Sequence, residues 1–206
     1  MRRVFDTLCA AAGIVVLCPL FVVIALAIKL KGGHGPVFYL QPRVGQDGRE
    51  FHLIKFRSMV TGADRQAALT VTEDPRITRV GHFLRQHKLD ELPQLINVVK
   101  GDMRLVGPRP EMKRYVDSFP AEYKVLLQNP PGITDPAALA FRDESKVLDA
   151  ENLEAHYLSQ ILPRKLRLSM EYSRHRTFLS DLKIIFQTVA GMHPKEYRAS
   201  LPGYDR

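Results

Sequence analysis

The stretch that decides the fold is residues 8–28, LCAAAGIVVLCPLFVVIALAI, because it holds 21 consecutive residues without a charged side chain. A helix of that length measures about 30 Å, which is the hydrocarbon thickness of a bilayer. A cleaved signal peptide is the alternative, with Arg2 and Arg3 as its basic region. The apolar run is longer than the core of such signals, however, and it continues directly into Lys29 and Lys31. The sequence therefore predicts a membrane segment.

The flanks and the middle of this segment predict its topology. Basic residues stand on both sides of it, and Lys and Arg are enriched in cytoplasmic flanks. Pro19, preceded by Cys18, lies at the middle, where it removes a backbone hydrogen bond and kinks a helix. The sequence thus favours a re-entrant helix that enters and leaves by one face. An ordinary spanning helix with a tolerated proline is the alternative.

The composition limits the class of partner. The 206 residues are 45% hydrophobic and 25% charged, with a net charge of +8, so an anionic partner is expected: nucleic acid, lipid head groups or a phosphorylated ligand. Tryptophan is absent and the aromatic residues do not alternate with cations, which argues against nucleic acid. The two cysteines, Cys9 and Cys18, both lie in the apolar run, which excludes a disulfide framework and a cysteine-rich metal site.

Beyond the glycines at 32–35, the pattern predicts a small hairpin. Residues 37–44 and 50–59 read as two strands joined around a Gln-Asp-Gly turn. Alternation in the second strand places Lys55 and Arg57 on one face, where the pair could bind a diphosphate. Two solvated charges at the end of a strand are an equally good interpretation.

Helical patterns follow the hairpin. Short helices are expected at 77–86, 89–99 and 120–128, and a stiff proline-rich loop at 106–110 carries Arg109. Residues 158–189 predict basic amphipathic helices, which could lie on an anionic membrane or form the inner face of a core.

The carboxylate pair Asp90-Glu91 is the densest chemistry in the chain. Pro93 is tolerated only in a first turn, so the helix should begin near Asp90 and place both carboxylates at its positive end. One carboxylate could attack an electrophile while the other holds a divalent cation. The alternative is that both residues simply cap the helix.

The cations around this pair favour a phosphorylated substrate. Arg85 and Arg109, with Lys55 and Arg57 from the hairpin, would suffice to neutralise a pyrophosphate. Carboxylate ligands without cysteines or paired histidines suit Mg²⁺ better than zinc. The sequence has neither a Walker loop nor a glycine-rich dinucleotide motif, so an ATPase or a nicotinamide enzyme finds no support.

Four blocks together with the apolar start and its central proline carry a family resemblance. They are RVGQDGREFHLIKFRSM (43–59), ITRVGHFLRQHKLDELPQLINVVKGDMRLVGPRPEM (77–112), PPGIT (130–134) and DLKIIFQTV (181–189). In this order they resemble the bacterial sugar transferases called monotopic phosphoglycosyl transferases, in their minimal, core-only form. The resemblance runs from the first residues to about residue 190.

This resemblance implies an α+β, mostly helical, monotopic protein of the bacterial inner membrane, facing the cytoplasm. A re-entrant helix over 1–31 would precede a catalytic domain over 32–206, with interfacial amphipathic helices. Such enzymes move a phosphosugar from a UDP-sugar to polyprenyl phosphate and release UMP, as the first membrane step of glycoconjugate synthesis. The resemblance does not specify which sugar is transferred, which pathway the enzyme serves or its oligomeric state.

The resemblance also implies residue roles. Asp90 would be the nucleophile that carries a covalent phosphosugar, and Glu91 would bind Mg²⁺. The substrate phosphates would meet Arg85 and Arg109, with Lys55 and Arg57 lining the same pocket. Cys18 and Pro19 would form the re-entrant break, with cysteine where many members have serine.

One block departs from the family pattern. After PPGIT many members continue with Gly-Trp-Ala-Gln, whereas this chain has Asp135-Pro136-Ala137-Ala138, so the sugar specificity of other members cannot be assigned to this chain.

Two other functions are alternatives to the transferase. A membrane-tethered binding module would show no Mg²⁺ dependence. A glycosidase would need its two carboxyls further apart than adjacent residues hold them.

Overall fold

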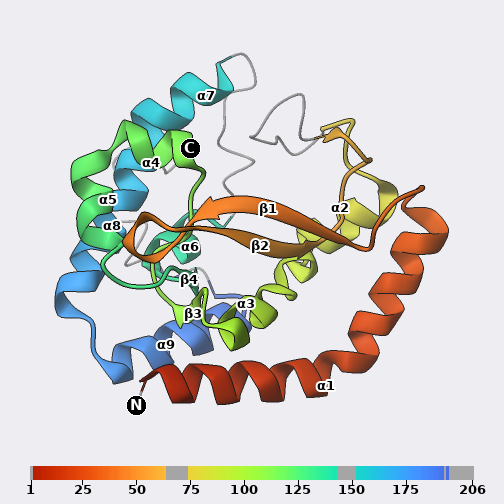
Figure 1. The fold of residues 1–206 in the computed structure, drawn as a ribbon, viewed down its shortest axis with the longest axis horizontal. Coiled ribbons are helices and arrows are strands. Elements are labelled where there is room, and N and C mark those ends of the chain that lie inside the picture. The colour runs from red at the N-terminus through yellow and green to blue at the C-terminus, as the bar shows by residue number, and fades with distance from the viewer. Residues whose placement is uncertain (1, 64–73, 143–151, 193, 195–206) are drawn as a thin grey trace. The chain divides into compact units, whose positions relative to one another are not determined.

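The computed structural model describes residues 2–63, 74–142, 152–192 and 194, and these form two compact units (Figure 1). Unit 1 comprises residues 3–42 and 52–101, and unit 2 comprises Arg2, residues 43–51 and the described residues from 102 onward. The chain is mostly helical, as the sequence predicted. In chain order up to residue 101 the elements are α1 (Arg2–Lys31), β1 (Phe38–Val44), η1 (Gln46–Gly48), β2 (Glu50–Phe56), α2 (Arg79–Gln86), η3 (Leu89–Glu91) and α3 (Gln94–Lys100). They are followed by β3 (Arg104–Val106), α4 (Lys113–Ser118), α5 (Pro120–Leu126), β4 (Gly132–Thr134), α6 (Pro136–Ala140), α7 (Leu153–His156), η5 (Tyr157–Ile161), α8 (Leu162–His175) and α9 (Phe178–Val189).

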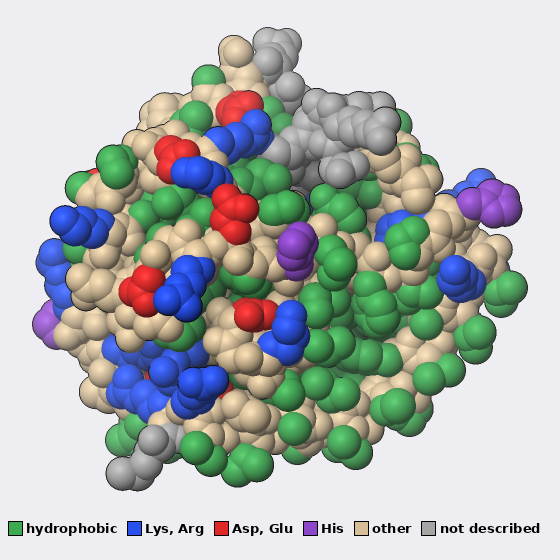
Figure 2. Space-filling model, viewed as in Figure 1, with side chains coloured by type: hydrophobic (Ala, Val, Ile, Leu, Met, Phe, Trp, Pro, Cys, Tyr) green, Lys and Arg blue, Asp and Glu red, His purple; other side chains and the backbone are tan. Residues whose placement is uncertain are grey.

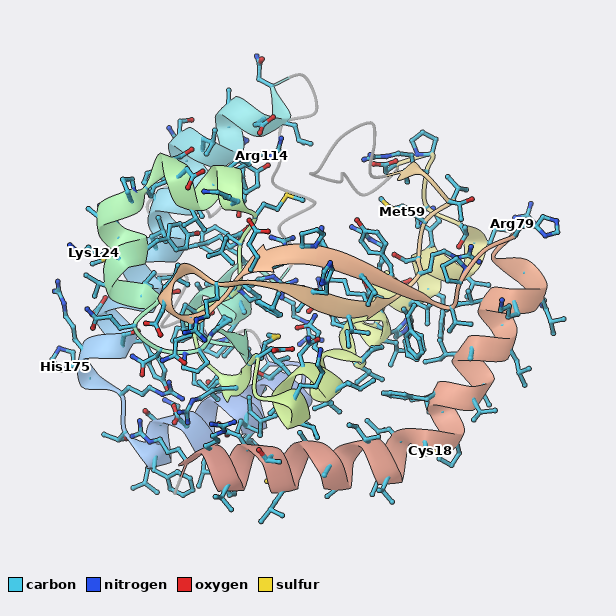
Figure 3. All side chains as sticks on the ribbon, viewed as in Figure 1. Cys18, Met59, Arg79, Arg114, Lys124 and His175 are labelled. Atoms are coloured by element: carbon cyan, nitrogen blue, oxygen red, sulfur yellow. The ribbon has the colours of Figure 1, made fainter. Side chains whose placement is uncertain are left out.

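The apolar segment forms one long helix, α1, with a sharp bend near its middle (Figure 1). Figure 3 places Cys18 at this corner, directly before Pro19. Proline lacks the amide hydrogen that would continue the ladder, and its ring displaces the preceding turn, so the predicted kink is present. By its length and composition, the helix is long and apolar enough to cross a membrane. These two properties are compatible with both predicted topologies.

Aromatic and aliphatic side chains fix the C-terminal half of α1 inside unit 1. The buried cluster consists of Ile24, Ile28, Phe56 and Leu84. The ring of Phe56 contacts the rings of Phe21 and Phe38, with centroids 5.2 and 5.4 Å apart. The end of α1 therefore packs against β2 and α2. The rest of the helix surface is largely apolar and exposed, and hydrophobic side chains dominate this region in Figure 2.

The predicted hairpin is confirmed as β1 and β2, which form a two-stranded sheet. A buried asparagine of α3 continues the hydrogen bonding of β2. The amide of Ile54 donates to Asn97 Oδ1 at 3.0 Å, and Asn97 Nδ2 donates to the carbonyl of His52 at 2.8 Å. Asn97 thus binds the strand as a neighbouring strand would, and anchors α3 to it.

The helix predicted at 89–99 is divided into two parts. A short 3-10 turn, η3, covers Leu89–Glu91, and α3 begins only at Gln94. Leu92 and Pro93 keep right-handed helical angles between them, so the backbone follows one helical path. The interruption reflects Pro93, which cannot donate a hydrogen bond to the preceding turn.

Unit 2 contains a parallel pair of short strands that the sequence pattern did not predict. Arg104 pairs with Gly132 and Val106 with Thr134. The two backbones approach so closely that a Cβ on Gly132 would lie 2.1 Å from the amide nitrogen of Gly107. Glycine in the PPGIT block is therefore required by backbone contact. Val106, Leu139 and Ile184 form the buried core here.

Helices α8 and α9, where amphipathic helices were expected, differ in how far their apolar side chains are buried. In α8, Leu162, Leu166 and Leu168 are buried, so its apolar stripe faces a protein core. In α9, by contrast, large apolar side chains remain exposed: Phe178, Leu179, Leu182, Phe186 and Val189. The core interpretation holds for α8, and the predicted membrane contact stays open for α9.

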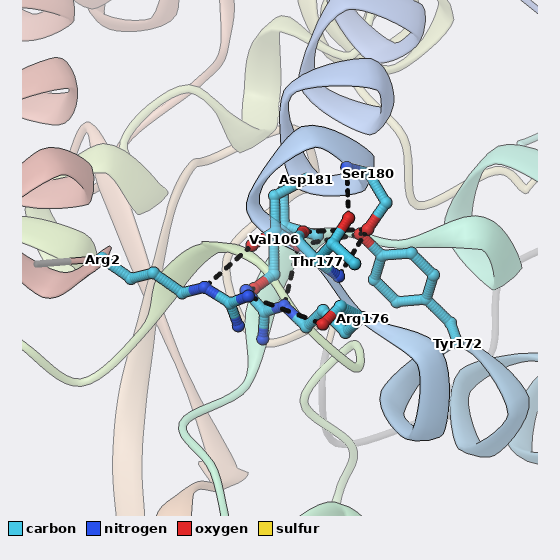
Figure 4. A network of polar contacts seen from close by, with 7 residues as sticks. All are labelled: Arg2, Val106, Tyr172, Arg176, Thr177, Ser180 and Asp181. Atoms are coloured by element: carbon cyan, nitrogen blue, oxygen red, sulfur yellow. Dashed lines mark hydrogen bonds and ion pairs between the residues drawn. The ribbon is translucent and has the colours of Figure 1, made fainter.

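A polar network holds the start of α9 (Figure 4). Thr177 and Ser180 form a reciprocal capping box, which satisfies the free amides of the first turn. Asp181 accepts hydrogen bonds from Tyr172 and from the Nε of Arg176, both at 2.7 Å, and it lies 3.9 Å from the Nε of Arg2. The guanidinium of Arg176 also donates to the carbonyl of Val106, which joins α9 to β3.

Candidate active site

The Asp90-Glu91 pair lies in unit 1, on a turn shaped by an unusual backbone. Lys88, the residue before η3, adopts left-handed angles (φ 56°, ψ 21°) that β-carbon-bearing residues seldom adopt. This conformation interrupts the helical backbone between α2 and η3. The side chain of Asp90 is then buried, with 7% of the residue exposed, and no described residue hydrogen-bonds its Oδ1.

The electrostatics of Asp90 are those of a carboxyl removed from water among cations. Burial raises the pKa of Asp90, and the neighbouring charge of Glu91 acts in the same direction. The charges of Lys55, Arg85 and Lys88 act in the opposite direction, because they stabilise the anion. A carboxylate held in this way is more basic than an exposed one, and it is surrounded by groups that attract phosphate.

The capping alternative does not match the geometry of the pair. The residue that precedes η3 is Lys88 and the residue that precedes α3 is Pro93, and neither start has a side-chain capping hydrogen bond. The buried Oδ1 of Asp90 accepts no backbone amide in the described chain. Burial of an unpaired carboxyl oxygen is costly, which is typical of a site that binds a ligand.

Lys55 and Glu91 lie together, as the proposed site requires. The Nζ of Lys55, on β2, is 3.9 Å from Oε1 of Glu91, and the two side chains are 17% and 18% exposed. Arg85 is half-buried in the last turn of α2 and is close enough for its charge to act on Asp90. Unit 1 thus brings together four of the predicted residues.

Arg57 takes a position that the strand pattern did not predict. It lies just after the end of β2 and is 6% exposed. Its guanidinium donates to the backbone carbonyls of His34 and Gly33, at 2.6 and 2.8 Å. Arg57 thus lies beyond the strand on which Lys55 stands. It fastens the loop that follows α1, and its predicted contact with substrate stays a prediction.

Arg109 belongs to unit 2. Its charge acts on Glu111, which lies at the centre of a buried polar cluster. The carboxylate of Glu111 accepts from Arg43 NH1 and from the hydroxyl of Tyr157, both at 2.8 Å, and it lies 3.9 Å from the Nζ of Lys165. Burial alone would raise the pKa of Glu111, but the charges of Arg43 and Lys165 outweigh it and hold the pKa below the usual value. The charge of Arg109 acts in the same direction.

Asp135, at the departure from the family pattern, has a structural role in unit 2. Its Oδ1 accepts from the amide of Ala138 at 2.7 Å and caps α6, while Pro136 occupies the first helical position. The hydroxyl of Ser169 donates to its other oxygen. Burial nevertheless raises the pKa of Asp135. The replacement of the family sequence at this point thus builds a capped helix.

Sequence reasoning missed several polar residues that the fold buries. Lys165 belongs to the basic stretch 158–189, yet it is 7% exposed and its Nζ lies 3.9 Å from Glu111. Gln94 is 1% exposed with both amide atoms unpaired in the described chain. Sequence reasoning also missed the exposed Lys88, whose charge acts on Asp90. The position of Gln94, four residues after Asp90 on a helical path, was a signal that could have identified it.

The described residues fit a magnesium ion only together with a substrate. Among residues 2–63, 74–142, 152–192 and 194, no three His, Cys, Asp or Glu side chains gather as a complete metal-binding set. Mg²⁺ usually takes one or two carboxylates and completes its shell with water and substrate phosphates. The carboxylate of Glu91, beside the buried and unpartnered oxygen of Asp90, is the protein ligand that such a site would use.

Comparison with known proteins identifies the family. The family model of the bacterial sugar transferases matches residues 1–195. The chain is 39% identical over 91% of its length to the undecaprenyl-phosphate glucose phosphotransferase of Komagataeibacter xylinus, of which it covers 35%. It is 35% identical over 92% of its length to the UDP-glucose:undecaprenyl-phosphate glucose-1-phosphate transferase of Escherichia coli, covering 39%.

A shorter relative matches over most of its own length. The UDP-glucose:undecaprenyl-phosphate glucose-1-phosphate transferase of Caulobacter vibrioides is 34% identical over 93% of this chain and 69% of the relative. The chain therefore spans well under half of the first two relatives and about two thirds of this one. The family match covers the bent helix, the hairpin, the buried carboxylate pair and α9. The chain belongs to the bacterial sugar transferase family.

Proposed function

We propose that this protein transfers a sugar phosphate from a UDP-sugar to a polyprenyl phosphate, with Asp90 as the nucleophile. The observation that carries the proposal is the buried carboxyl of Asp90, which has an unpartnered oxygen and lies among the charges of Lys55, Arg85 and Lys88. The family and the names of its relatives support the same reaction class.

The proposed reaction has two displacements at phosphorus. In the first, the carboxylate of Asp90 attacks the phosphorus that bears the sugar, an acyl phosphate bond forms, and the bond to the departing UMP breaks. In the second, an oxygen of polyprenyl phosphate attacks the same phosphorus and the acyl phosphate bond breaks. Asp90 is regenerated as the carboxylate, and the product is a polyprenyl diphosphate sugar.

The cations of unit 1 have a defined task in this scheme. An anionic carboxylate is repelled by an anionic diphosphate, so the charge of the diphosphate must be neutralised before the two can approach. The proximity of Lys55 to Glu91 and the action of the Lys55 and Arg85 charges on Asp90 support this role for the two cations. Glu91 and the substrate phosphates would hold Mg²⁺, which supplies further neutralisation of the diphosphate. Arg57 and Arg109 are proposed to bind the phosphates of the substrate as well.

The membrane placement of the reaction follows from its acceptor. Polyprenyl phosphate has an anionic head group at the interface and an apolar chain in the bilayer. We propose that α1 enters and leaves by the cytoplasmic face of the inner membrane, bent at Pro19. The exposed apolar side chains of α9 would lie in the same interface.

The test uses the purified full chain with undecaprenyl phosphate and a panel of UDP-sugars: UDP-glucose, UDP-galactose and their N-acetyl forms. We expect Mg²⁺-dependent UMP release with at least one of them. In the absence of acceptor, label from the sugar-phosphate should remain on a peptide that contains Asp90. Asp90→Asn should lower turnover by about three orders of magnitude or more, because the nucleophile is lost.

Three results would contradict the proposal. UMP release at the wild-type rate by Asp90→Asn would exclude Asp90 as the nucleophile. Full activity in EDTA would exclude the role given to Glu91. Lipid binding without any UMP release would favour the membrane-tethered binding module.

A further inference from the structure

Two buried amides on one helix of unit 1 differ in a way that points to a ligand. Asn97 is 0% exposed and Gln94 is 1% exposed, so both amides have been removed from water. Both ends of the Asn97 amide are hydrogen-bonded to the backbone of β2. Neither Oε1 nor Nε2 of Gln94 has a hydrogen-bond partner in the described chain.

An unpaired buried amide is expensive for a folded protein. Its donor and acceptor have lost water without gaining a partner, so the full desolvation cost of the group stays with the folded state. An apolar side chain of similar shape would avoid this cost. A glutamine at this position is therefore explained if a bound molecule supplies its partner.

The position of Gln94 indicates which molecule that is. Leu92 and Pro93 keep right-handed helical angles between η3 and α3, so Gln94 follows Asp90 by about one helical turn of chain. Gln94 therefore lies about one turn away from Asp90, whose Oδ1 is likewise buried and unpaired in the described residues. The two side chains together present two acceptors and one amide donor without partners.

We infer that Gln94 is a further binding residue for the reaction, and that its side-chain NH2 donates a hydrogen bond to the phosphoryl group that Asp90 attacks. This rests on the proposed function, because it takes Asp90 as the nucleophile. A non-bridging phosphoryl oxygen is an anionic acceptor, and an amide NH2 has two hydrogens. One can reach the phosphoryl oxygen while the other meets Oδ1 of Asp90, which aligns the carboxylate with the phosphorus.

The inference separates stability from activity, and three variants test it. Gln94→Met keeps the length and unbranched shape of the side chain but removes the amide. Its melting temperature should be unchanged or raised, because a buried unpaired group is gone. The value of kcat/KM for UMP release should fall about 100-fold, as for loss of one donor to developing charge. Gln94→Glu keeps the acceptor and loses the NH2, and it should be as defective.

Asn97→Leu is the matched control, since it also removes a buried amide from α3. It leaves the amide of Ile54 and the carbonyl of His52 unpaired, so its melting temperature should fall by roughly 4–8 °C. Each variant is compared with the wild-type enzyme in both measurements. The UMP-release assay uses undecaprenyl phosphate and the UDP-sugar of the panel that the wild type turns over best.

Four outcomes would overturn the inference. If Gln94→Met keeps kcat/KM within threefold of the wild type, Gln94 does not bind the reacting group, and the proposed function stands. If Gln94→Met melts as low as Asn97→Leu, its amide belongs to the fold. Near-wild-type turnover by Gln94→Glu would exclude the NH2 as the acting group. If the wild type itself releases no UMP with any UDP-sugar, the proposed function fails and the inference with it.

Discussion

At the scale of single residues, the chain buries polar groups in two different states. Glu111 in unit 2 has its charge matched by Arg43 and Lys165 and accepts a hydrogen bond from Tyr157. Asp90 in unit 1 keeps an oxygen without a partner in the described chain. A fully paired carboxylate stabilises a fold, whereas an unpaired one is kept for chemistry or binding.

The paired state of Glu111 predicts a dependence of stability on pH. Because its pKa is lower in the folded protein, the carboxylate contributes stability above its ordinary pKa, and this contribution is lost as the pH falls through the lowered value. We expect Glu111→Gln to lower the free energy of unfolding by about 2 kcal/mol at pH 7, since Arg43 and Lys165 lose their counter-charge.

Denaturant unfolding of the wild type and Glu111→Gln between pH 7 and pH 3 measures this effect. The difference between the two proteins should shrink toward the acid end. The control is Glu154→Gln, whose partner Arg114 is about half exposed, and it should cost under about 1 kcal/mol. Equal costs for the two variants at pH 7 would contradict the assigned role of Glu111.

At the scale of elements, α1 is the one whose sequence and geometry bear most directly on function. Its bend lies at Cys18 and Pro19, between two basic flanks. A proline inside a helix costs about 3 kcal/mol relative to alanine, so it is placed where a straight helix is not wanted. The bend is a property of the structure, and the return of the chain to the same membrane face is the property to be measured.

Single cysteines at Val4 and Leu30, in a chain with Cys9→Ala and Cys18→Ala, report the topology without removing the basic flanks. Both positions are exposed, at 62% and 80%. We expect an impermeant maleimide to label neither cysteine in intact cells and both after permeabilisation. In the same background Pro19→Ala should allow α1 to straighten, so that a fraction of the Val4 cysteine is labelled from outside. Labelling of that cysteine from outside with Pro19 present would establish the spanning form.

At the scale of the whole molecule, two forces could hold the protein on a membrane. The net charge of +8 attracts anionic lipid, and that attraction is screened over about 3 Å in 1 M salt. The second force is the burial of the apolar surface of α1 in the bilayer. Added NaCl does not screen this force, because it is hydrophobic. The 21 uncharged residues of this helix make the second force the stronger one.

Washing membranes that contain the full chain distinguishes the two forces. We expect more than nine tenths of the protein to stay in the membrane fraction in 1 M NaCl and at alkaline pH, and to leave only in detergent. Phe186→Ser in α9, whose side chain is 66% exposed, should not change this result. Release of the wild type by 1 M NaCl alone would show that its attachment is electrostatic.

Local sequence alone determined much of this protein. An apolar run with a central proline predicted a kinked helix, a strand-turn-strand pattern predicted a hairpin, and the ordered blocks indicated the family. The carboxylate pair was also recognisable, because Asp90 and Glu91 are adjacent in the sequence. These features depend on contacts between near neighbours in the chain, which a sequence pattern records directly.

Only the tertiary structure decided which polar groups are buried and with what partners. The guanidinium of Arg57 bonds the loop after α1, the ammonium of Lys165 lies near Glu111, and the parallel pairing of β3 with β4 joins residues far apart in sequence. The difference between Asn97 and Gln94 also appears only there. The free energy of a buried polar group depends on partners brought by distant segments, and no local pattern specifies them.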